Sequence, residues 1–207
     1  MGSFNVLLGG TSEEESMEEA LNTRTFTAPA GTHSDDALLA EAAKTDPRAF
    51  GELYERYYER IYRYVYHRVG NAPDAEDVTA MIFMKALEAM PTYQLRRSSF
   101  APWLFRIARN AVIDHYRRGR KQSPLDEVEF YSKDGDPALD VLTAERRAEL
   151  RSLVEHLSDD QRDVVLMRYS ADLSFPEIAT TLNKNEPAVR MLLHRGLRKL
   201  KAVMDDV

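Results

Sequence analysis

Apolar residues recur at helical spacing along most of the chain, and the clearest example lies between residues 98 and 121. One face of this segment repeats at steps of three and four residues, which is the period of a buried helical stripe. Its members are Leu104, Ile107, Ala108, Ala111, Val112 and His115. The opposite face carries Arg106, Asn110, Ile113 and Arg117, with Arg109 and Asp114 at its edges. The pattern predicts a helix that packs on a core with one face and contacts something outside the protein with its basic face.

Three more helices are predicted before this segment. Ser34 is a candidate N-cap for the first of them. Asp46 and Pro47 open a longer helix, which Gly70 ends. Its periodic positions are Phe50, Leu53, Tyr54, Tyr57, Ile61, Tyr64, Val65 and Arg68. A further helix, over residues 74–90, completes a helical module with the basic segment.

Helical periodicity resumes near residue 144 and continues to the C-terminal end. Ser158 is a predicted N-cap, and Ser174 and Asn185 are predicted to cap the last two helices. The predicted core positions of these two helices are Ala179, Leu182, Val189, Leu192, Leu193 and Leu197. Two helices joined by a tight turn are the plan of a helix-turn-helix motif, whose second helix enters the major groove of DNA. Taken alone, the same pattern also fits two short helices that only pack together.

These elements predict an all-α protein built from two small helical domains. The first spans residues 35–121 and the second spans residues 144–207. Residues 122–143 contain two prolines and several acids with little periodicity, so we expect a flexible acidic linker. Residues 1–34 contain turn formers and acids without a sustained period, so we expect a disordered acidic extension.

Basic charge is concentrated in two parts of a chain whose net charge is −6. Residues 95–121 carry eight basic residues against Asp114 alone, and residues 164–207 carry seven bases against five acids. Acidic stretches lie before the first basic stretch and between the two. Because the local field, and not the global charge, steers a polyanion to a surface, the two basic stretches predict two contacts with nucleic acid.

Other kinds of chemistry find no support in the sequence. The chain has no cysteine, which excludes disulfides, thiolate metal sites and a cysteine nucleophile. Its five histidines are scattered, and no paired metal-ligand spacing or Gly-rich phosphate loop occurs, so we expect no catalytic residues, no metal and no cofactor. No apolar run approaches the roughly 20 residues that a membrane span needs. The N-terminus lacks the features of a signal peptide, so we expect a soluble, cytoplasmic protein.

Two stretches of the chain resemble a known family. "AFGELYERYYERIYRYVYHRVGNAPDAEDVTAMIFMKALEAM", followed by "SSFAPWLFRIARNAVIDHYRR", resembles region 2 of bacterial RNA polymerase sigma factors of the extracytoplasmic-function (ECF) group of the sigma-70 family. "LSDDQRDVVLMRYSADLSFPEIATTLNKNEPAVRMLLHRGLRKLK" resembles their region 4. The resemblance implies an alternative sigma factor, not an enzyme, that recognises promoter −10 and −35 elements and promotes DNA melting.

The resemblance also implies partners and residue roles. The partners are core RNA polymerase, through its beta-prime clamp helices and beta flap, and promoter DNA, both as duplex and as the melted non-template strand. An anti-sigma factor is left open as a further partner. The residues implied in docking on the clamp helices are Asp74, Glu76, Asp77, Phe83 and Lys85. Those implied at the −10 element are Arg96, Arg97, Trp103, Arg106, Arg109, Asn110, Arg117 and Arg118. Those implied at the −35 element are Lys184, Glu186, Arg190, Met191, His194, Arg195 and Arg198.

Several of these residues have a structural alternative. Carboxylates such as Asp74 at the start of a helix also compensate the helix dipole. Trp103 offers a stacking platform for a base, but an aromatic residue at the start of an amphipathic helix is more often part of the core. The tyrosines of the long helix have the same two interpretations. The chain also departs from the family pattern, with Ala80 and Met81 where many members carry Gln-Glu, which puts the polar part of the docking contact in doubt.

Two rival functions come from other classes. An enzyme acting on nucleic acid would need a cluster of histidines and carboxylates, which the sequence does not contain. A helix-turn-helix repressor would bind duplex DNA alone, as a dimer on two half-sites. The region-2-like half, for which a repressor has no use, favours a sigma factor.

Overall fold

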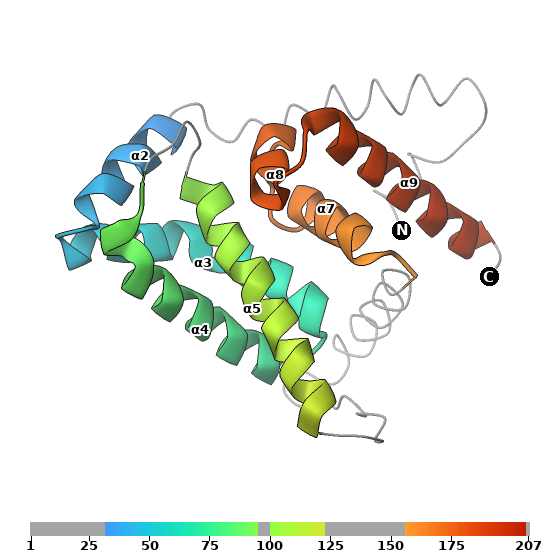
Figure 1. The fold of residues 1–207 in the computed structure, drawn as a ribbon, viewed down its shortest axis with the longest axis horizontal. Coiled ribbons are helices and arrows are strands. Elements are labelled where there is room, and N and C mark those ends of the chain that lie inside the picture. Colours follow the sequence, from blue (N-terminus) through green and yellow to red (C-terminus); the bar gives the residue numbers. More distant parts are fainter. Residues whose placement is uncertain (1–31, 95–99, 123–155, 206–207) are drawn as a thin grey trace, which may run out of the picture.

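Two groups of helices form the protein, and the chain passes through one group before it enters the other (Figure 1). The computed structural model describes residues 32–94, 100–122 and 156–205. The first group consists of α2 (Thr32–Ala42), α3 (Pro47–Val69), α4 (Ala72–Ala89), the 3₁₀ turn η1 (Met90–Thr92) and α5 (Phe100–Gln122). The second consists of α7 (Asp159–Tyr169), α8 (Phe175–Leu182) and α9 (Glu186–Asp205). No strand occurs within these ranges, which confirms the predicted all-α class.

The long helix α3 begins and ends where its sequence predicts. The side chain of Asp46 accepts a hydrogen bond from the backbone N–H of Arg48 at 2.9 Å, and Pro47 occupies the first turn. Gly70 adopts a left-handed φ of 90°, and its N–H donates to the carbonyl of Tyr66. All the predicted periodic positions of this helix are buried except Tyr54, whose ring is exposed.

The predicted cap of the first helix is wrong. α2 begins at Thr32, so Ser34 lies within its first turn and not before it. The buried carboxylate of Asp36 accepts hydrogen bonds from the Tyr57 hydroxyl and from the guanidinium of Arg56. We attribute the longer helix to this anchor, which holds the first turns of α2 against α3.

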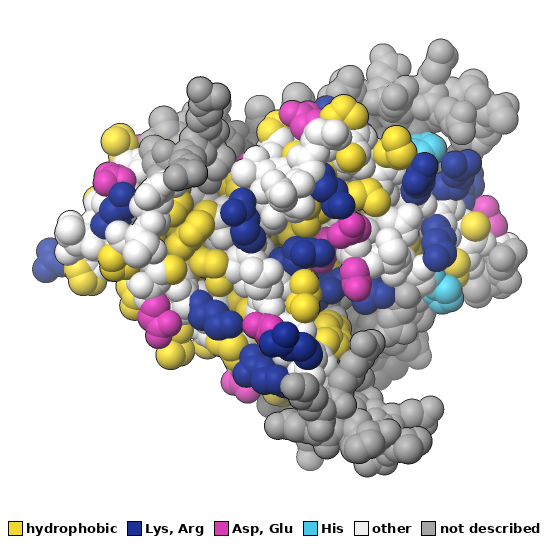
Figure 2. Space-filling view, in the orientation of Figure 1, with side chains coloured by type: hydrophobic (Ala, Val, Ile, Leu, Met, Phe, Trp, Pro, Cys, Tyr) yellow, Lys and Arg dark blue, Asp and Glu magenta, His cyan; other side chains and the backbone are white. Residues whose placement is uncertain are grey.

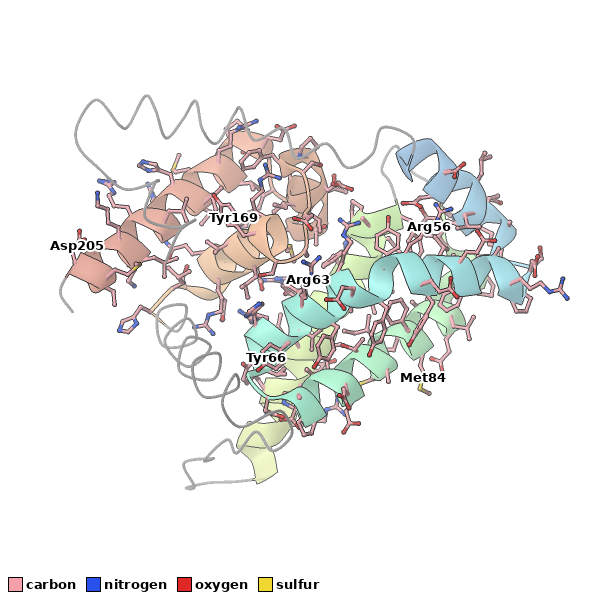
Figure 3. All side chains as sticks on the ribbon, turned by 180° about the vertical axis from the view of Figure 1, so that it is seen from behind. Arg56, Arg63, Tyr66, Met84, Tyr169 and Asp205 are labelled. Carbon is pink, nitrogen blue, oxygen red and sulfur yellow. The ribbon has the colours of Figure 1, made fainter. Side chains whose placement is uncertain are left out.

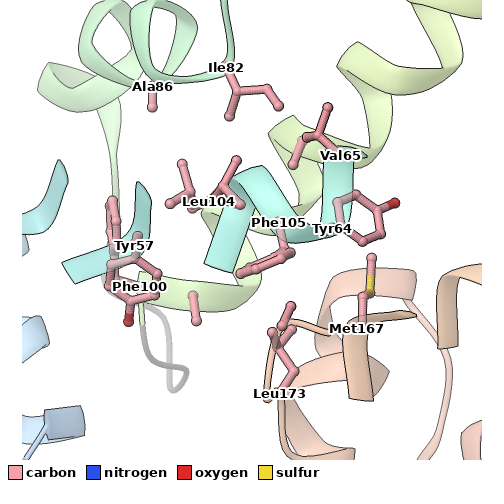
Figure 4. Packing of buried hydrophobic residues seen from close by; sticks show 14 of the residues in the cluster. Tyr57, Tyr64, Val65, Ile82, Ala86, Phe100, Leu104, Phe105, Met167 and Leu173 are labelled. Atoms are coloured by element: carbon pink, nitrogen blue, oxygen red, sulfur yellow. The ribbon is translucent and has the colours of Figure 1, made fainter. Parts of the chain in front are cut away.

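The core of the first group lies between α3, α4 and α5. Figure 4 shows Leu104 of α5 facing Ile82 and Ala86 of α4, with Val65 of α3 beside them. The ring of Phe100 packs edge-on against Tyr57 at a centroid distance of 5.3 Å. The apolar stripe predicted for residues 98–121 is therefore buried, although its outer members Ile107 and His115 are only half-buried.

The second group packs directly on the first. α8 lies against α5, and α7 lies against α3, so one apolar cluster runs through both groups (Figures 1 and 4). Met167 and Leu173 of the second group approach Tyr64 and Phe105 of the first, and all four are buried. Figure 3, seen from behind, shows Arg63 of α3 at the same boundary. The two predicted domains thus share an interface.

Part of the sequence prediction falls outside the described residues. The expected N-terminal extension over residues 1–34 and the expected linker over residues 122–143 lie there almost entirely. The domain limits at 35–121 and 144–207 accordingly remain predictions. Within the described parts, the helices of each predicted domain form one spatial group.

Candidate nucleic-acid interface

The helix-turn-helix predicted from the sequence is present as α8 and α9. Ser174 and Glu177 form a reciprocal capping box at the start of α8, with each side chain bonded to the other residue's backbone N–H. Asn183 ends α8 in the left-handed region, with φ 53° and ψ 46°, and this reverses the chain. The side chain of Asn185 accepts from the N–H of Ala188 at 2.8 Å and so caps α9. All three caps are made by residue types that are favoured in turns and helix caps. Interactions between residues close in sequence therefore form the motif.

The first turns of α9 present polar and basic side chains away from the core. Arg190 is exposed, and its guanidinium lies 4.0 Å from the ring centroid of Phe175, the first residue of α8. A carboxylate oxygen of Glu186 lies 3.8 Å from the same guanidinium. The cation–π contact and the ion pair hold Arg190 at the N-terminal end of the helix. This is the end from which a recognition helix contacts base edges.

The remaining residues predicted for the −35 element lie on or next to α9. Met191, Arg195 and Arg198 are exposed, and His194 is half-buried. The ammonium group of Lys184, in the turn, lies 3.0 Å from a carboxylate oxygen of Asp160 on α7. Figure 2 shows a group of basic side chains over α9 and others over α5. The structure therefore brings the predicted −35 residues to one helix and the turn before it.

The basic face of α5, which we define as Arg106, Arg109, Asn110, Arg117 and Arg118, has two different environments. Toward the C-terminal end, Arg117 and Arg118 are exposed. Among the described residues, both bond to Asp114 on their own helix, and Arg118 also bonds to the sulfur of Met81. Toward the N-terminal end, Arg106 donates to the carbonyl of Thr180 in α8 at 3.1 Å. The second group of helices therefore contacts the N-terminal half of this face, in which Arg106 and Asn110 remain exposed.

Arg109 is held by carboxylates of α7. Its Nε donates to Asp163 Oδ2 at 2.6 Å, and its Nη2 donates to Asp160 Oδ1 at 3.3 Å. Burial lowers the pKa of Arg109, but the hydrogen bond and the charge of Asp163 outweigh this effect and leave the pKa raised. The guanidinium is therefore fixed in its charged form between the two groups.

Asp163 is the buried centre of this cluster, and its side chain is fully shielded from water. Besides Arg109, it accepts a hydrogen bond from the Tyr64 hydroxyl at 2.8 Å, and Arg68 Nη1 lies 3.5 Å from its Oδ1. Burial, followed by the charge of Asp163, raises the pKa of Tyr64 well above its ordinary value. A buried carboxylate is costly unless it is paired and hydrogen-bonded, and here residues of the other domain provide the partners.

Two predicted −10 residues, Arg96 and Arg97, lie outside the described residues. Trp103 lies half-buried in an aromatic cluster, with ring centroids 4.9 Å from Tyr93 and 5.2 Å from Phe100. This position favours its interpretation as part of the core over a free stacking platform.

The residues predicted to dock on polymerase lie on α4, and they have different surroundings. Asn71 caps the helix by accepting from the N–H of Asp74 and donating to its carboxylate, at 2.9 and 2.8 Å. Glu76 and Asp77 are exposed. Phe83 is buried, with its ring centroid 4.6 Å from that of Tyr54. The ammonium group of the remaining member, Lys85, lies 4.0 Å from Asp114 of α5.

Sequence reasoning missed two exposed apolar residues on the same helix. Met84 and Leu87 are 64% and 50% exposed, and they lie beside the predicted docking residues (Figure 3 labels Met84). Large apolar side chains at such exposure mark surfaces for another protein when they occur together. Their helical spacing of three residues was the signal, since it places both on one face of α4.

The tyrosines of α3 divide into two sets. Tyr57 and Tyr64 are buried and hydrogen-bonded to Asp36 and Asp163. The others form a row of neighbouring rings along the outer side of the helix: Tyr54, Tyr58, Tyr62 and Tyr66. Both sets pack within the protein in this structure, which agrees with the interpretation of these tyrosines as part of the core.

Within the described residues, no group of three or more histidine, cysteine, aspartate or glutamate side chains could hold a metal ion. No helix in the described ranges is both long and apolar enough to cross a membrane.

Family models match both groups of helices. The model described as Sigma-70 region 2 matches residues 53–122, and the model described as Sigma-70, region 4 matches residues 147–200. The ECF RNA polymerase sigma factor BldN of Streptomyces coelicolor is 35% identical over 172 residues, which cover 82% of this chain and 65% of BldN. The ECF RNA polymerase sigma factor SigD of Mycobacterium tuberculosis is 31% identical over 173 residues, covering 80% of this chain and 82% of SigD.

Solved structures show the same architecture. CnrH, in complex with the cytosolic domain of CnrY, is 26% identical and superposes with a TM-score of 0.66, covering 83% of this chain and 97% of that chain. The sigma factor RpoE of Bartonella quintana, in complex with the anti-sigma factor NepR, is 17% identical with a TM-score of 0.58, and covers 75% of this chain and 96% of that chain. At that identity the second likeness concerns the fold alone.

Proposed function

Because the chain belongs to the extracytoplasmic-function group of the sigma-70 family, we propose that it is an alternative sigma factor that directs core RNA polymerase to promoters. It recognises the −10 and −35 elements and promotes melting of the DNA. The observation that carries the proposal is the pairing, in one chain, of a helix-turn-helix with a second domain that bears its own basic helix face. The protein contributes binding energy and not catalysis, and acts where the polymerase is, in the cytoplasm.

Contact with the −35 element is assigned to α9. The guanidinium of Arg190 offers a fork for guanine, and Glu186 can accept from the exocyclic amine of cytosine. The exposed side chains of Arg195 and Arg198 and the ammonium group of Lys184 are suited to phosphates, which position the helix without specifying sequence. Met191 and His194 complete the surface toward the groove.

Contact with the −10 element is assigned to the basic face of α5, together with Arg96, Arg97 and the neighbouring Trp103. Arginines along a helix can follow the phosphates of a single strand, and Asn110 has both a donor and an acceptor for a base edge. Such contacts offset the few kcal/mol that unstacking and unpairing the first base costs. Duplex anchoring by α9 and strand capture by α5 together promote opening.

Docking on the polymerase is assigned to α4. The exposed acids Glu76 and Asp77 and the partly exposed Asp74 provide charge, and Lys85 lies on the same helix. Phe83 supports this surface from beneath, since it is buried under Tyr54 and Tyr58. We add the exposed apolar side chains of Met84 and Leu87, which provide the apolar area that a stable contact needs. The clamp helices of the beta-prime subunit are the expected partner here, and the beta flap is the expected partner of the second domain.

An anti-sigma factor is a further expected partner. The solved relative CnrH was determined with the cytosolic domain of CnrY. The likeness to that chain extends over both domains, so a regulator that holds both is compatible with this architecture.

Transcription in vitro tests the proposed function. Fragmented genomic DNA of the source organism is transcribed by its core polymerase with and without the protein, and start sites are mapped. We expect discrete start sites that require the protein and that Arg190→Ala weakens. Arg48→Ala, which removes an exposed arginine of α3 far from α9, is the matched control and should behave as the parent.

The same experiment separates the sigma factor from a repressor. If the protein yields no new start sites and does not bind core polymerase, yet binds duplex DNA tightly on its own as a dimer, it is a helix-turn-helix repressor.

A further inference from the structure

An aromatic ring at the start of α8 lies against the arginine of α9 that the proposed function assigns to guanine. The guanidinium carbon of Arg190 is 4.0 Å from the ring centroid of Phe175, over the ring. The ring is buried and belongs to the apolar cluster, whereas 48% of the Arg190 side chain is exposed. The arginine therefore rests on an apolar support and still reaches solvent.

The position of this ring is fixed by its neighbours. Phe175 lies inside the capping box of α8, in which the hydroxyl and the backbone N–H of Ser174 donate to Glu177 Oε2 at 2.7 and 2.8 Å. The guanidinium carbon of Arg168 on α7 also lies over the ring, 5.2 Å from its centroid, and Arg168 donates to the carbonyl of Leu173 at 3.2 Å. The ring therefore cannot follow the side chain of α9 when that side chain moves.

Contact with a ring leaves the hydrogen-bond donors of an arginine available. The five N–H donors of a guanidinium lie in its plane, and guanine O6 and N7 accept two of them. An aromatic ring contacts the face of the group and not these donors. The carboxylate of Glu186 lies 3.8 Å from Arg190 Nη2, but both side chains are exposed, and such an ion pair contributes little energy. The ring therefore supports Arg190 without competing with a base for it.

Holding the side chain in advance makes binding more favourable. An arginine loses rotamer freedom when an interface immobilises it, and this loss weakens binding. A contact that already restricts the side chain in the free protein reduces the loss. We propose that Phe175 is a positioning residue for the −35 element, which acts through Arg190 and does not itself contact a base. This inference rests on the proposed function, because that function assigns Arg190 to guanine.

Polymerase reconstituted with the full chain tests the proposal on duplex fragments that carry a mapped −35 element. Each base pair of the element is replaced in turn, and the affinity of the holoenzyme for each fragment is measured by competition. Phe175→Leu should lower the affinity for the unchanged element about 2- to 5-fold. It should also reduce the preference at the same base pair that Arg190→Ala affects. Phe175→Tyr retains the face of the ring and should retain both properties.

A double-mutant cycle separates positioning from a purely structural role. In a chain that already carries Arg190→Ala, Phe175→Leu should lower the affinity little further, because the ring acts through the arginine. The matched control is Ile178→Val, which changes a fully buried residue of the same helix and should leave the base preference as in the parent. The proposal is overturned if Phe175→Leu lowers the affinity equally with and without Arg190, or lowers it equally for every sequence.

A direct readout covers the case in which Phe175→Leu does not fold. Nuclear magnetic resonance of the free protein detects the Nε–H and Cδ protons of Arg190, which are assigned by their absence in Arg190→Lys. Protons over the face of an aromatic ring are shifted upfield by the ring current. We expect this shift for Arg190 relative to Arg198, an exposed arginine of the same helix. Equal shifts for the two arginines overturn the proposal.

Failure of the proposed function would look different. In that case no start site depends on the protein, yet the protons of Arg190 still report the contact with the ring. The same variants are then compared on random-sequence duplexes that the chain binds without polymerase. Coupling between Phe175 and Arg190 on those duplexes would retain the positioning role and remove the sigma-factor role.

Discussion

Two buried phenols make the first domain sensitive to alkaline pH. Burial, followed by a hydrogen bond to Asp36, raises the pKa of Tyr57 above its ordinary value, and burial with the charge of Asp163 does the same for Tyr64. Each group holds its proton more tightly in the folded protein than in the unfolded chain. Its contribution to stability is therefore complete below the unfolded pKa of about 10 and declines as pH rises above it.

The expected loss follows from linkage. At one pH unit above the unfolded pKa, a phenol that stays protonated in the folded state lowers the free energy of unfolding by about 1.4 kcal/mol. Replacing either residue by phenylalanine removes its titration. Between pH 8 and pH 11, Tyr57→Phe and Tyr64→Phe should each lose about 1.4 kcal/mol less than the parent, and the double variant about 2.8 kcal/mol less.

Urea unfolding followed by tryptophan fluorescence measures this difference. Trp103 is the only tryptophan, and it lies in the aromatic cluster of the same domain, next to Tyr93 and Phe100. Each variant also loses a hydrogen bond, but that offset is the same at both pH values and cancels in the comparison. If the parent and Tyr64→Phe lose stability in parallel from pH 8 to pH 11, the hydroxyl of Tyr64 is not buried against Asp163, and the interface described above is wrong.

Three further predictions concern packing, capping and DNA. Phe105→Ala should lower the free energy of unfolding by about 3–5 kcal/mol in urea titrations, because the ring is fully buried, whereas Ile113→Ala at an exposed site of the same helix should change it by less than about 1 kcal/mol. Ser174→Ala removes the capping box of α8 and should cost about 1 kcal/mol in the same assay, with glycine at this position costing less than alanine. Arg190→Ala should lower the affinity for the −35 element about 5- to 150-fold and reduce the preference for one base of that element. Arg198→Ala should instead lower the affinity for all DNA sequences equally. An equal loss of affinity on every sequence for Arg190→Ala would contradict its role in base recognition.

The helices and their caps could be predicted because local signals determine them. The periodic stripe of α3 and the caps Asp46, Gly70 and Ser174 lie within a few residues of the positions they influence. The same reasoning failed at Ser34, where a contact with α3, far along the sequence, extends the helix. A local pattern cannot report a partner more than 20 residues away.

The interface between the domains could not be predicted for the same reason. Phe105 falls outside the stripe that the period of α5 assigns to the core, and it is buried where Tyr64 of α3 and residues of the second domain meet. Asp163 lies in the second turn of α7, at a position to which the sequence pattern assigns no role, yet its side chain is buried. The signal available was its position directly before the apolar run Val164–Met167, and that signal does not identify a partner on α3 and α5.

The burial of Asp163 also constrains how this chain can change in evolution. Loss of one member of a buried ion pair strongly destabilises the folded protein, but replacing both members by apolar residues of similar volume often leaves its stability unchanged. Asp163 and its partners Arg109, Arg68 and Tyr64 would therefore be free to change together if they served the fold alone. Arg109 is also assigned to the promoter strand, so its replacement by an apolar residue would weaken DNA binding. Selection for DNA recognition should therefore preserve Asp163, although Asp163 itself does not contact DNA.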